Sequence, residues 1–243
     1  MKRLLNILLL AGCVCLLSRN GFATATFNAD NFTTGNKAVT LVTAPHPAAR
    51  ITYGVEQLRK ALQEAGYQVT VKEQATLPGS GTAITIGLLN DALTQKAIRT
   101  CHFSVTKTPG KEGFTLLGNS NHVVIGGADA SGVLYGCLEM ADRVRTAGSL
   151  PAQLSFTDQP EMVLRGTCVG IQKPTYLPGR MVYEYPYTPE VFPWLYDKAL
   201  WIRYLDMLAK NRMNSLYLWN GHPFASLVRL KDYPYAVEVD SAT

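Results

Sequence analysis

Residues suited to binding a polar ligand follow a short apolar run near the carboxyl end of the chain. The run SLYLW ends at Trp219, and Asn220 and His222 come next. Amide and imidazole groups donate and accept hydrogen bonds, and an indole ring can stack on an apolar face. A pyranose has both an apolar face and a rim of hydroxyl groups, so this combination favours a sugar-binding site. The alternative is that His222 is a structural residue whose hydrogen bonds are satisfied inside the protein.

A second group of candidate ligand-binding residues lies in the segment 172–196, QKPTYLPGRMVYEYPYTPEVFPWLY. Its aromatic residues are Tyr176, Tyr183, Tyr185, Tyr187, Phe192, Trp194 and Tyr196, with prolines spread among them. The prolines restrict the unfolded chain and so reduce the entropy lost when the loop becomes ordered. We expect Tyr185 to stack on a sugar and Glu184 to contact its hydroxyl groups. The aromatic residues could instead serve only to pack the loop onto the domain.

The elements that would position these residues follow a strand–helix–strand order. The run 162–171, MVLRGTCVGI, is almost continuously apolar, which predicts a strand buried on both faces. The segment 198–214 has helical spacing, and we expect these side chains to face inward: Trp201, Ile202, Leu205, Leu208, Ala209 and Met213. The strand 215–219 completes a βαβ unit of the kind that builds parallel sheets and (β/α)8 barrels. In such folds the loops after the strands gather at one edge, where sites form.

The number of residues bears on how much of a barrel is present. A complete (β/α)8 barrel takes about 250 residues. The segment 162–243 is far shorter, and its last residues, YAVEVDSAT, contain no helix stop and no closing strand. The segment is therefore either a much smaller parallel α/β domain or the first part of an incomplete barrel, and we expect the incomplete barrel.

Arg165 is the charged residue inside the apolar run 162–171. Burying an unpaired charge is costly, so the guanidinium needs a partner. One interpretation is that it points inward and binds ligand hydroxyl groups in bidentate fashion. The other is that it forms a structural ion pair with a carboxylate of the barrel.

Residues 26–150 predict a small mixed α/β domain in the order β-α-β-β-α-β-β-α. Strands are expected at 38–43, 68–73 and 83–88 and in a hairpin over 113–127; helices are expected at 52–65, 91–98 and 131–145. In the first helix Val55, Leu58, Leu62 and Ala65 share one face, and Gly66 supplies the stop. We expect Asp91 to cap the second helix, and Asp129 or Ser131 to cap the third. The segment 146–162 is rich in small and turn-forming residues, so we place a linker at 151–161 before the barrel part, 162–243.

The glycine-rich stretch 125–136, IGGADASGVLYG, follows a strand and opens a helix. Such a turn can bind phosphate at the amino end of the helix. The stretch does not match GxGxxG, and it lacks the Lys-Ser or Lys-Thr pair of a P-loop. We therefore interpret it as a tight strand-to-helix turn.

The first 25 residues, MKRLLNILLLAGCVCLLSRNGFATA, have the layout of a secretory signal peptide. A basic start precedes an apolar run that is too short and too poorly flanked for a membrane span, and small residues follow. Ala23-Thr24-Ala25 suits ordinary cleavage, whereas Leu10-Ala11-Gly12-Cys13 resembles a bacterial lipobox, which would anchor the protein in the outer membrane through Cys13. Either route predicts an exported bacterial protein in the periplasm or at the cell surface.

Charge and residue types argue against a nucleic-acid-binding, metal-binding or disulfide-rich protein. Removing the three basic residues of 1–25 lowers the formal net charge from +5 to +2, and basic clusters with interleaved aromatic residues are missing, so nucleic acid is not an expected partner. No HExxH occurs and the histidines lie far apart, so a metal site is not expected. The glycine-rich stretch fails the known cofactor motifs, so a cofactor is not expected either. Cys101, Cys137 and Cys168 are widely spaced, which favours small buried side chains over disulfides or zinc ligands.

The segment EGFTLLGNSNHVVIGGADASGVLYGCLEMADRV resembles the small α/β domain that precedes the catalytic barrel in β-hexosaminidase-like and α-glucuronidase-like glycoside hydrolases. The shared features are a hairpin, a turn of the GG-D-GV-YG kind and a helix. LRG at 164–166 resembles the first barrel strand of these enzymes, and DMLAKNRMNSLYLWNGHPF resembles their first helix and second strand. The resemblance covers roughly residues 36–225.

The resemblance implies that this chain is the N-terminal part of a glycoside hydrolase with a carbohydrate substrate. In those enzymes the Arg of the first strand binds sugar hydroxyl groups, a role that would fall to Arg165. Their second strand usually ends in His-, Trp- and Asp-rich sequence, whereas this one ends in WNGHPF, so their substrate preference is not carried over. Their acid residues lie on later strands, which implies that the catalytic carboxylates lie beyond the end of this chain. The alternative is a non-catalytic glycan-binding protein of the cell envelope.

Overall fold

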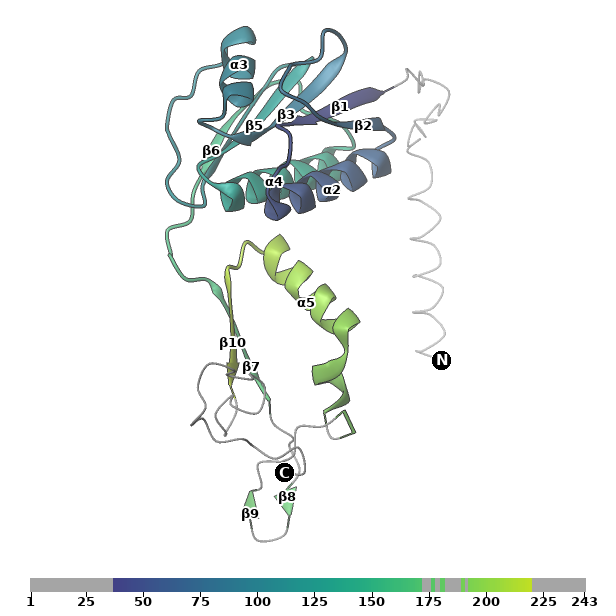
Figure 1. Ribbon diagram of the computed structural model, residues 1–243, viewed down its shortest axis with the longest axis vertical. Helices are drawn as coiled ribbons and strands as arrows, with labels where there is room; N and C mark the ends of the chain where they lie inside the picture. The colour runs from purple at the N-terminus through teal and green to yellow at the C-terminus, as the bar shows by residue number, and fades with distance from the viewer. Residues whose placement is uncertain (1–36, 172–175, 178–179, 182–188, 191, 220–243) are drawn as a thin grey trace, which may run out of the picture. The chain divides into compact units, whose positions relative to one another are not determined.

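The computed structural model describes residues 37–171, 176–177, 180–181, 189–190 and 192–219. All of these belong to the compact unit Asn36–Thr243. Residues 38–158 contain a six-stranded sheet with three helices, and residues 166–219 contain a βαβ unit (Figure 1). The fold is therefore mixed α/β, as predicted.

The six-stranded sheet has the strand order β2-β1-β3-β5-β4-β6. Its strands are β1 (Ala38–Thr43), β2 (Gln68–Glu73), β3 (Thr82–Leu88), β4 (Phe114–Gly118), β5 (His122–Gly127) and β6 (Leu154–Asp158). β1 is parallel to β2 and β3, and β3 is parallel to β5. β4 is antiparallel to β5 and β6, because a short turn joins β4 to β5 as a hairpin. Asn119 holds this turn, since its Oδ1 accepts hydrogen bonds from the backbone N–H groups of Asn121 and His122.

Helices cover both faces of this sheet (Figure 1). α2 (Ala49–Glu64) and α4 (Ala130–Ala147) pack on one face, where Ile125 joins their core. α3 (Ala92–Thr100) packs on the other face, together with Val124. Successive strand residues point to opposite faces, so β5 contributes apolar side chains to both layers of core.

The predicted face of α2 is confirmed. Val55, Leu58 and Leu62 are buried, and Ala65 packs partly buried against the same core. Gly66 follows the helix with φ +83°, a left-handed conformation that suits the residue after a helix end. α2 also approaches α4 closely, because a Cβ atom on Gly54 would lie 3.0 Å from Cβ of Cys137.

The predicted strands and helices up to residue 150 are present in the predicted order. Of the two predicted helix caps, one is present and the other is not. Asp129 caps α4, since its Oδ1 accepts a hydrogen bond from the Gly132 N–H. Asp91 precedes α3 but makes no such bond; its Oδ2 accepts from the N–H of Leu88, at the end of β3. Contrary to our expectation, the side chain of Asp91 therefore does not cap α3 but holds the turn after β3.

The glycine-rich stretch is a tightly packed turn, as we interpreted it. A Cβ atom on Gly132 would lie 2.1 Å from the carbonyl oxygen of Gly113, and one on Gly136 would lie 2.7 Å from Cγ2 of Ile125. The same Gly113 oxygen accepts a hydrogen bond from the N–H of Ala128. The glycines therefore let α4 lie directly on the hairpin.

The segment 151–161, where we expected a linker, contains a strand. β6 forms the edge of the sheet and pairs with β4, placing Phe156 opposite Leu116. The ring of Phe156 lies 6.1 Å from that of Phe114. The turn-forming residues around this edge strand make its sequence resemble a linker. The domain limits themselves stay a prediction.

The first strand of the βαβ unit differs from its prediction. β7 comprises only Gly166–Gly170, and its residues alternate between exposed and half-buried. Val163 and Leu164 lie before the strand and are exposed. The expected strand over 162–171 with two buried faces is therefore wrong in this structure, because an apolar run alone does not specify where pairing begins.

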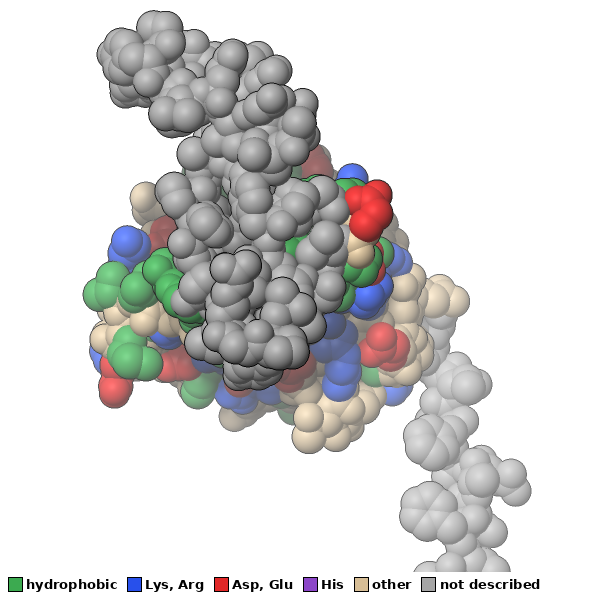
Figure 2. Space-filling model, turned by 90° about the horizontal axis from the view of Figure 1, so that it is seen from below, with side chains coloured by type: hydrophobic (Ala, Val, Ile, Leu, Met, Phe, Trp, Pro, Cys, Tyr) green, Lys and Arg blue, Asp and Glu red, His purple; other side chains and the backbone are tan. Residues whose placement is uncertain are grey.

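The second strand, β10 (Ser215–Trp219), is parallel to β7, so the predicted βαβ unit is confirmed. α5 (Lys198–Lys210) joins the two strands. Leu208 is its one buried residue, whereas Ile202 and Leu205, which we expected to face inward, are exposed. Figure 2 shows hydrophobic side chains at the surface among charged side chains of both signs. This βαβ unit is consistent with part of a (β/α)8 barrel.

The segment between β7 and α5 contains three short elements within the described residues. β8 (Tyr176–Leu177) and β9 (Arg180–Met181) form a two-residue antiparallel pair. The 3-10 helix η2 (Pro193–Tyr196) leads into α5, whose first turn is capped by Asp197. None of the described helices is long and apolar enough to cross a membrane.

Candidate functional site

Trp219 lies at the carboxyl end of β10, the edge at which the sequence predicts the sugar site. Its side chain is 39% exposed. It stands beside Gly170 of β7, where a Cβ atom would be 3.7 Å from the indole ring. The backbone there is held in register, since the Trp219 carbonyl accepts a hydrogen bond from the Ile171 N–H at 2.7 Å. An indole held on a paired strand offers a flat apolar surface to a ligand.

The other predicted contacts at that edge, Asn220, His222, Glu184 and Tyr185, lie outside the described residues. Their roles stay predictions.

Arg165 lies at the opposite end of the same strands. Gly166 pairs with Ser215, and Gly170 pairs with Trp219, four residues further along. At about 3.3 Å per residue, roughly 13 Å of strand separates the two ends. Arg165 precedes β7, whereas Trp219 ends β10. The expectation that Arg165 and Trp219 line one wall of a site does not fit this arrangement.

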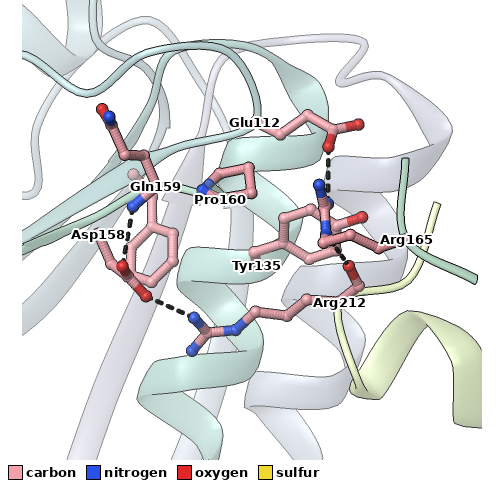
Figure 3. A pocket seen from close by; sticks show the side chains of 8 residues that line it. Glu112, Tyr135, Asp158, Gln159, Pro160, Arg165 and Arg212 are labelled. Atoms are coloured by element: carbon pink, nitrogen blue, oxygen red, sulfur yellow. Dashed lines mark hydrogen bonds and ion pairs between the residues drawn. The ribbon is translucent and has the colours of Figure 1, made fainter. Parts of the chain in front are cut away.

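The guanidinium of Arg165 is instead engaged in structural contacts (Figure 3). Its Nη2 lies 2.7 Å from Oε2 of Glu112, and both side chains are largely buried. Its Nε donates to the carbonyl of Arg212 at 2.8 Å, and its Nη1 donates to that of Met162 at 2.7 Å. The ion-pair interpretation is therefore the one that the structure supports. The partner is a carboxylate of the α/β domain, not one of the barrel.

Arg212 forms the second part of this cluster. Its Nη1 lies 2.7 Å from Oδ2 of Asp158, and its Nη2 forms an ion pair with Glu139. The guanidinium also lies 5.2 Å from the ring of Phe114. Asp158 ends β6 and Glu139 lies on α4, so one arginine contacts two elements of the α/β domain.

Asn214 completes the cluster. Its Nδ2 donates to Oε2 of Glu112 at 3.0 Å and to the carbonyl of Val163 at 2.8 Å. Its Oδ1 accepts from the N–H of Arg165 at 2.9 Å. We call the set formed by Glu112, Glu139, Asp158, Arg165, Arg212 and Asn214 the junction, since it links the α/β domain to the βαβ unit.

The junction borders a small cavity of about 130 Å³ (Figure 3). Its lining is Glu112, Phe114, Tyr135, Asp158, Gln159, Pro160, Arg165 and Arg212. The ring of Tyr135 lies 5.9 Å from the Arg165 guanidinium. Burial, and then the nearby Glu112 carboxylate, raise the pKa of Tyr135. Each charged group of this lining already has an ion-pair partner, so the cavity offers no free charge for a ligand or a reaction.

Two junction residues adopt a left-handed backbone conformation that residues other than glycine rarely adopt. Glu112 has φ +58° and Arg212 has φ +57°. A non-glycine residue in this region costs about 1–3 kcal/mol and persists only where its surroundings hold it. The Glu112 backbone N–H is held by Oδ2 of Asp129 at 2.8 Å.

Two aromatic residues of 172–196, Phe192 and Trp194, pack onto the βαβ unit. Phe192 is buried, and its ring lies 6.4 Å from that of Trp194. Trp194 lies 6.1 Å from Trp201 on α5, and Trp201 lies 6.0 Å from Tyr204. The Tyr204 hydroxyl is 2.7 Å from the Thr167 hydroxyl of β7. The packing interpretation therefore holds for Phe192 and Trp194.

The junction was not recognisable from the sequence, apart from Arg165. Glu112, Arg212 and Asn214 are polar residues in turns, a position that is ordinarily solvated. The one available signal was the absence of glycine at Arg212, directly after a helix end, where glycine is favoured. No cluster of His, Cys, Asp and Glu side chains that could hold a metal ion is found in the described part of the chain.

Comparison with known proteins identifies the class of fold. No family model matches the chain, and no curated protein matches it. Among solved structures, a GH115 4-O-methyl-α-glucuronidase with specificity for decorated arabinogalactans is similar. It shares 18% identity, covers 76% of this chain and has a TM-score of 0.50; this chain covers 25% of it. The chain thus has a glycoside hydrolase-like fold, which confirms the resemblance noted in the sequence.

A second solved structure is similar in sequence as well as in fold. This structure, a GH138 enzyme targeting pectin rhamnogalacturonan II, is 46% identical over 84% of this chain, with a TM-score of 0.63. The chain spans only about a fifth of that enzyme, 21% of its length.

Proposed function

We propose that this chain is the N-terminal part of an exported glycoside hydrolase that acts on a pectic glycan. The observation that supports this most directly is the 46% identity to the GH138 enzyme over 84% of the chain. The order of an α/β domain followed by a βαβ unit is compatible with it. The domain order is that of hexosaminidase-like and glucuronidase-like enzymes, but the pectic substrate is inferred from the GH138 similarity.

In this proposal the sugar binds at the carboxyl ends of β7 and β10. Trp219 stacks on the apolar face of a pyranose, and Asn220 and His222 bind hydroxyl groups from the next positions of the chain. Tyr185 and Glu184 contribute from the loop after β7. This arrangement places the ligand at the edge where parallel α/β folds bind their ligands.

The junction carboxylates are poor candidates for catalysis. Glycoside hydrolysis needs two carboxyl groups, or one together with a group of the substrate, on either side of the scissile bond. Glu112, Glu139 and Asp158 are each paired with an arginine, and their partners Arg165 and Arg212 lie at the amino ends of the strands. We therefore place the catalytic carboxylates on later strands of the full protein, beyond Thr243.

Export is part of the same proposal and rests on residues 1–25. The mature protein is expected in the periplasm, or at the outer membrane if Cys13 is lipidated. Mass spectrometry of the mature amino terminus distinguishes a start after Ala25 from a lipidated Cys13. An intact Met1 in the exported cell fraction would contradict both routes.

The activity is tested with purified rhamnogalacturonan II and the protein encoded by the complete reading frame. Release of new reducing ends by that protein, with binding but no release by the 243-residue chain, is the expected result. Trp219→Ala should weaken binding by the 243-residue chain about tenfold, since aromatic stacking contributes on the order of 1–2 kcal/mol. Binding without release by the complete protein would favour a non-catalytic glycan-binding protein of the envelope. Neither binding nor release would contradict the proposal.

A further inference from the structure

We propose that Arg212 and Glu112 are positioning residues, through which the α/β domain holds the amino ends of β10 and β7 and so orients the sugar site at their carboxyl ends. The part concerning the sugar site rests on the proposed function. Both residues act at the end of the strands opposite to Trp219.

The first support is that the junction contacts come from several separate places of the α/β domain. The α/β domain contributes three carboxylates from three separate places: Glu112 before β4, Glu139 on α4 and Asp158 at the end of β6. The βαβ unit contributes Arg165, just before β7, and Arg212, just before β10. Contacts from three places restrain rotation as well as separation, which a single ion pair would not do.

The second support is that the two arginines are joined to each other. The Nε of Arg165 donates to the backbone carbonyl of Arg212, and the backbone N–H groups of Asn214 and Ser215 donate to the carbonyl of Arg165. The starts of β7 and β10 are therefore tied together before their ladder begins at Gly166 and Ser215. A displacement at the junction moves both strands, and with them Trp219.

The third support is the backbone at Arg212. Arg212 follows Asn211, the residue that caps the carboxyl end of α5, with φ +57°. Glycine would adopt this conformation without strain. An arginine there keeps the strained backbone and, in return, pairs its guanidinium with Asp158 (Figure 3). The same guanidinium also forms an ion pair with Glu139.

The chain contains a matched control for this position. His102 follows Cys101, the residue that caps the carboxyl end of α3, with φ +54°, and its side chain is exposed. Arg212→Gly and His102→Gly therefore relieve the same kind of strain at the same place relative to a helix. Arg212→Gly additionally removes the two ion pairs of the junction.

The positions of the tryptophans allow the two parts to be followed separately. All three, Trp194, Trp201 and Trp219, lie within the βαβ unit, residues 166–219. Tryptophan fluorescence thus reports on that unit, while circular dichroism at 222 nm reports mainly on α2, α3 and α4. Coincidence of the two unfolding curves shows that the parts unfold together.

The experiment compares the parent chain with Arg212→Gly, Glu112→Gln and His102→Gly in thermal unfolding by both signals. We expect coincident curves for the parent and for His102→Gly. In Arg212→Gly the fluorescence transition should come about 5 °C or more below that of circular dichroism. Glu112→Gln keeps the size and backbone of Glu112, so it gives the same test if Arg212→Gly does not fold. Coincident curves in both junction variants would overturn the proposal.

Binding of purified rhamnogalacturonan II at 20 °C tests the positioning of the site. The dissociation constant should rise about tenfold in Arg212→Gly, which corresponds to about 1.4 kcal/mol, and stay unchanged in His102→Gly. Separate unfolding curves with unchanged affinity would show that the junction holds the unit without orienting the site. If the parent chain does not bind this glycan, the proposed function is wrong, and the unfolding comparison alone decides whether Arg212 holds the βαβ unit.

Discussion

The guanidinium of Arg165 lies 2.7 Å from the carboxylate of Glu112, a residue 53 positions earlier in the chain. The side chains are only 16% and 11% exposed, so this ion pair is largely removed from water. It joins a loop of the α/β domain to the start of the first strand of the βαβ unit.

Removing one partner of the pair should destabilise the protein more than removing both. Glu112→Ala leaves the Arg165 charge without its carboxylate, so the free energy of unfolding should fall by about 2–4 kcal/mol. Adding Arg165→Met should cost less than the same change costs in the parent, because the charge that needs a partner is then absent. Urea unfolding of the two single variants and the double variant measures the coupling. Strictly additive effects would contradict an energetic link between the residues.

Gly132→Ala should destabilise the α/β domain, although alanine is the better helix former. The new Cβ atom would lie 2.1 Å from the carbonyl oxygen of Gly113, a backbone atom that also accepts a hydrogen bond from Ala128. Overpacking of this kind costs about 1–3 kcal/mol. Thermal unfolding by circular dichroism should show the loss. Gly79→Ala is the control, since nothing lies within 4 Å of its Cβ position, and it should leave stability unchanged or slightly higher. Equal melting temperatures for Gly132→Ala and the parent would refute the close packing of α4 on the hairpin.

The three cysteines of the described region should react with iodoacetamide at very different rates. Cys168 is exposed and should react first. Burial raises the pKa of Cys101, so its thiolate is scarcer and its reaction slower. Cys137 is fully buried, and burial raises its pKa strongly, so it should react only after unfolding. Peptide mass spectrometry after timed labelling assigns the reaction to each cysteine. Early modification of Cys137 would show that α2 and α4 do not pack as described.

Acidification should weaken the fold through His122. Its Nε2 lies 3.2 Å from the Thr85 hydroxyl, and burial lowers the pKa of His122 below its ordinary value of 6.5. The unfolded chain therefore binds this proton more readily than the folded protein does. Stability from this residue is complete above pH 6.5 and is lost as the pH falls from there to the folded pKa, by about 1.4 kcal/mol for each unit between the two values. His122→Gln should flatten the dependence of unfolding free energy on pH between 7 and 5. A slope equal to that of the parent would rule out this contribution.

Much of the α/β domain could be predicted from the sequence. The face of α2 with Val55, Leu58 and Leu62, and the turn around Asn119, depend on residues close together in the chain. Local periodicity and turn chemistry are sufficient for such elements. The βαβ unit was predicted for the same reason, since an apolar strand, an amphipathic helix and a second strand follow each other directly. Strand β6 was missed because its five residues are held by β4, about forty residues away in sequence.

What the sequence alone determined is therefore the order of elements up to residue 150, the βαβ unit, the glycine turn and the position of Trp219 at the end of β10. Only the tertiary structure decided which partner Arg165 takes and which end of the strands it occupies. The physical reason is that an ion pair forms between groups that are close in space, whatever their distance in the sequence. Glu112 contacts Arg165 because the sheet, the hairpin and the start of β7 meet at one place. Asn214 and Arg212 join the same cluster from a turn whose polar residues, in the sequence, look like ordinary solvated side chains.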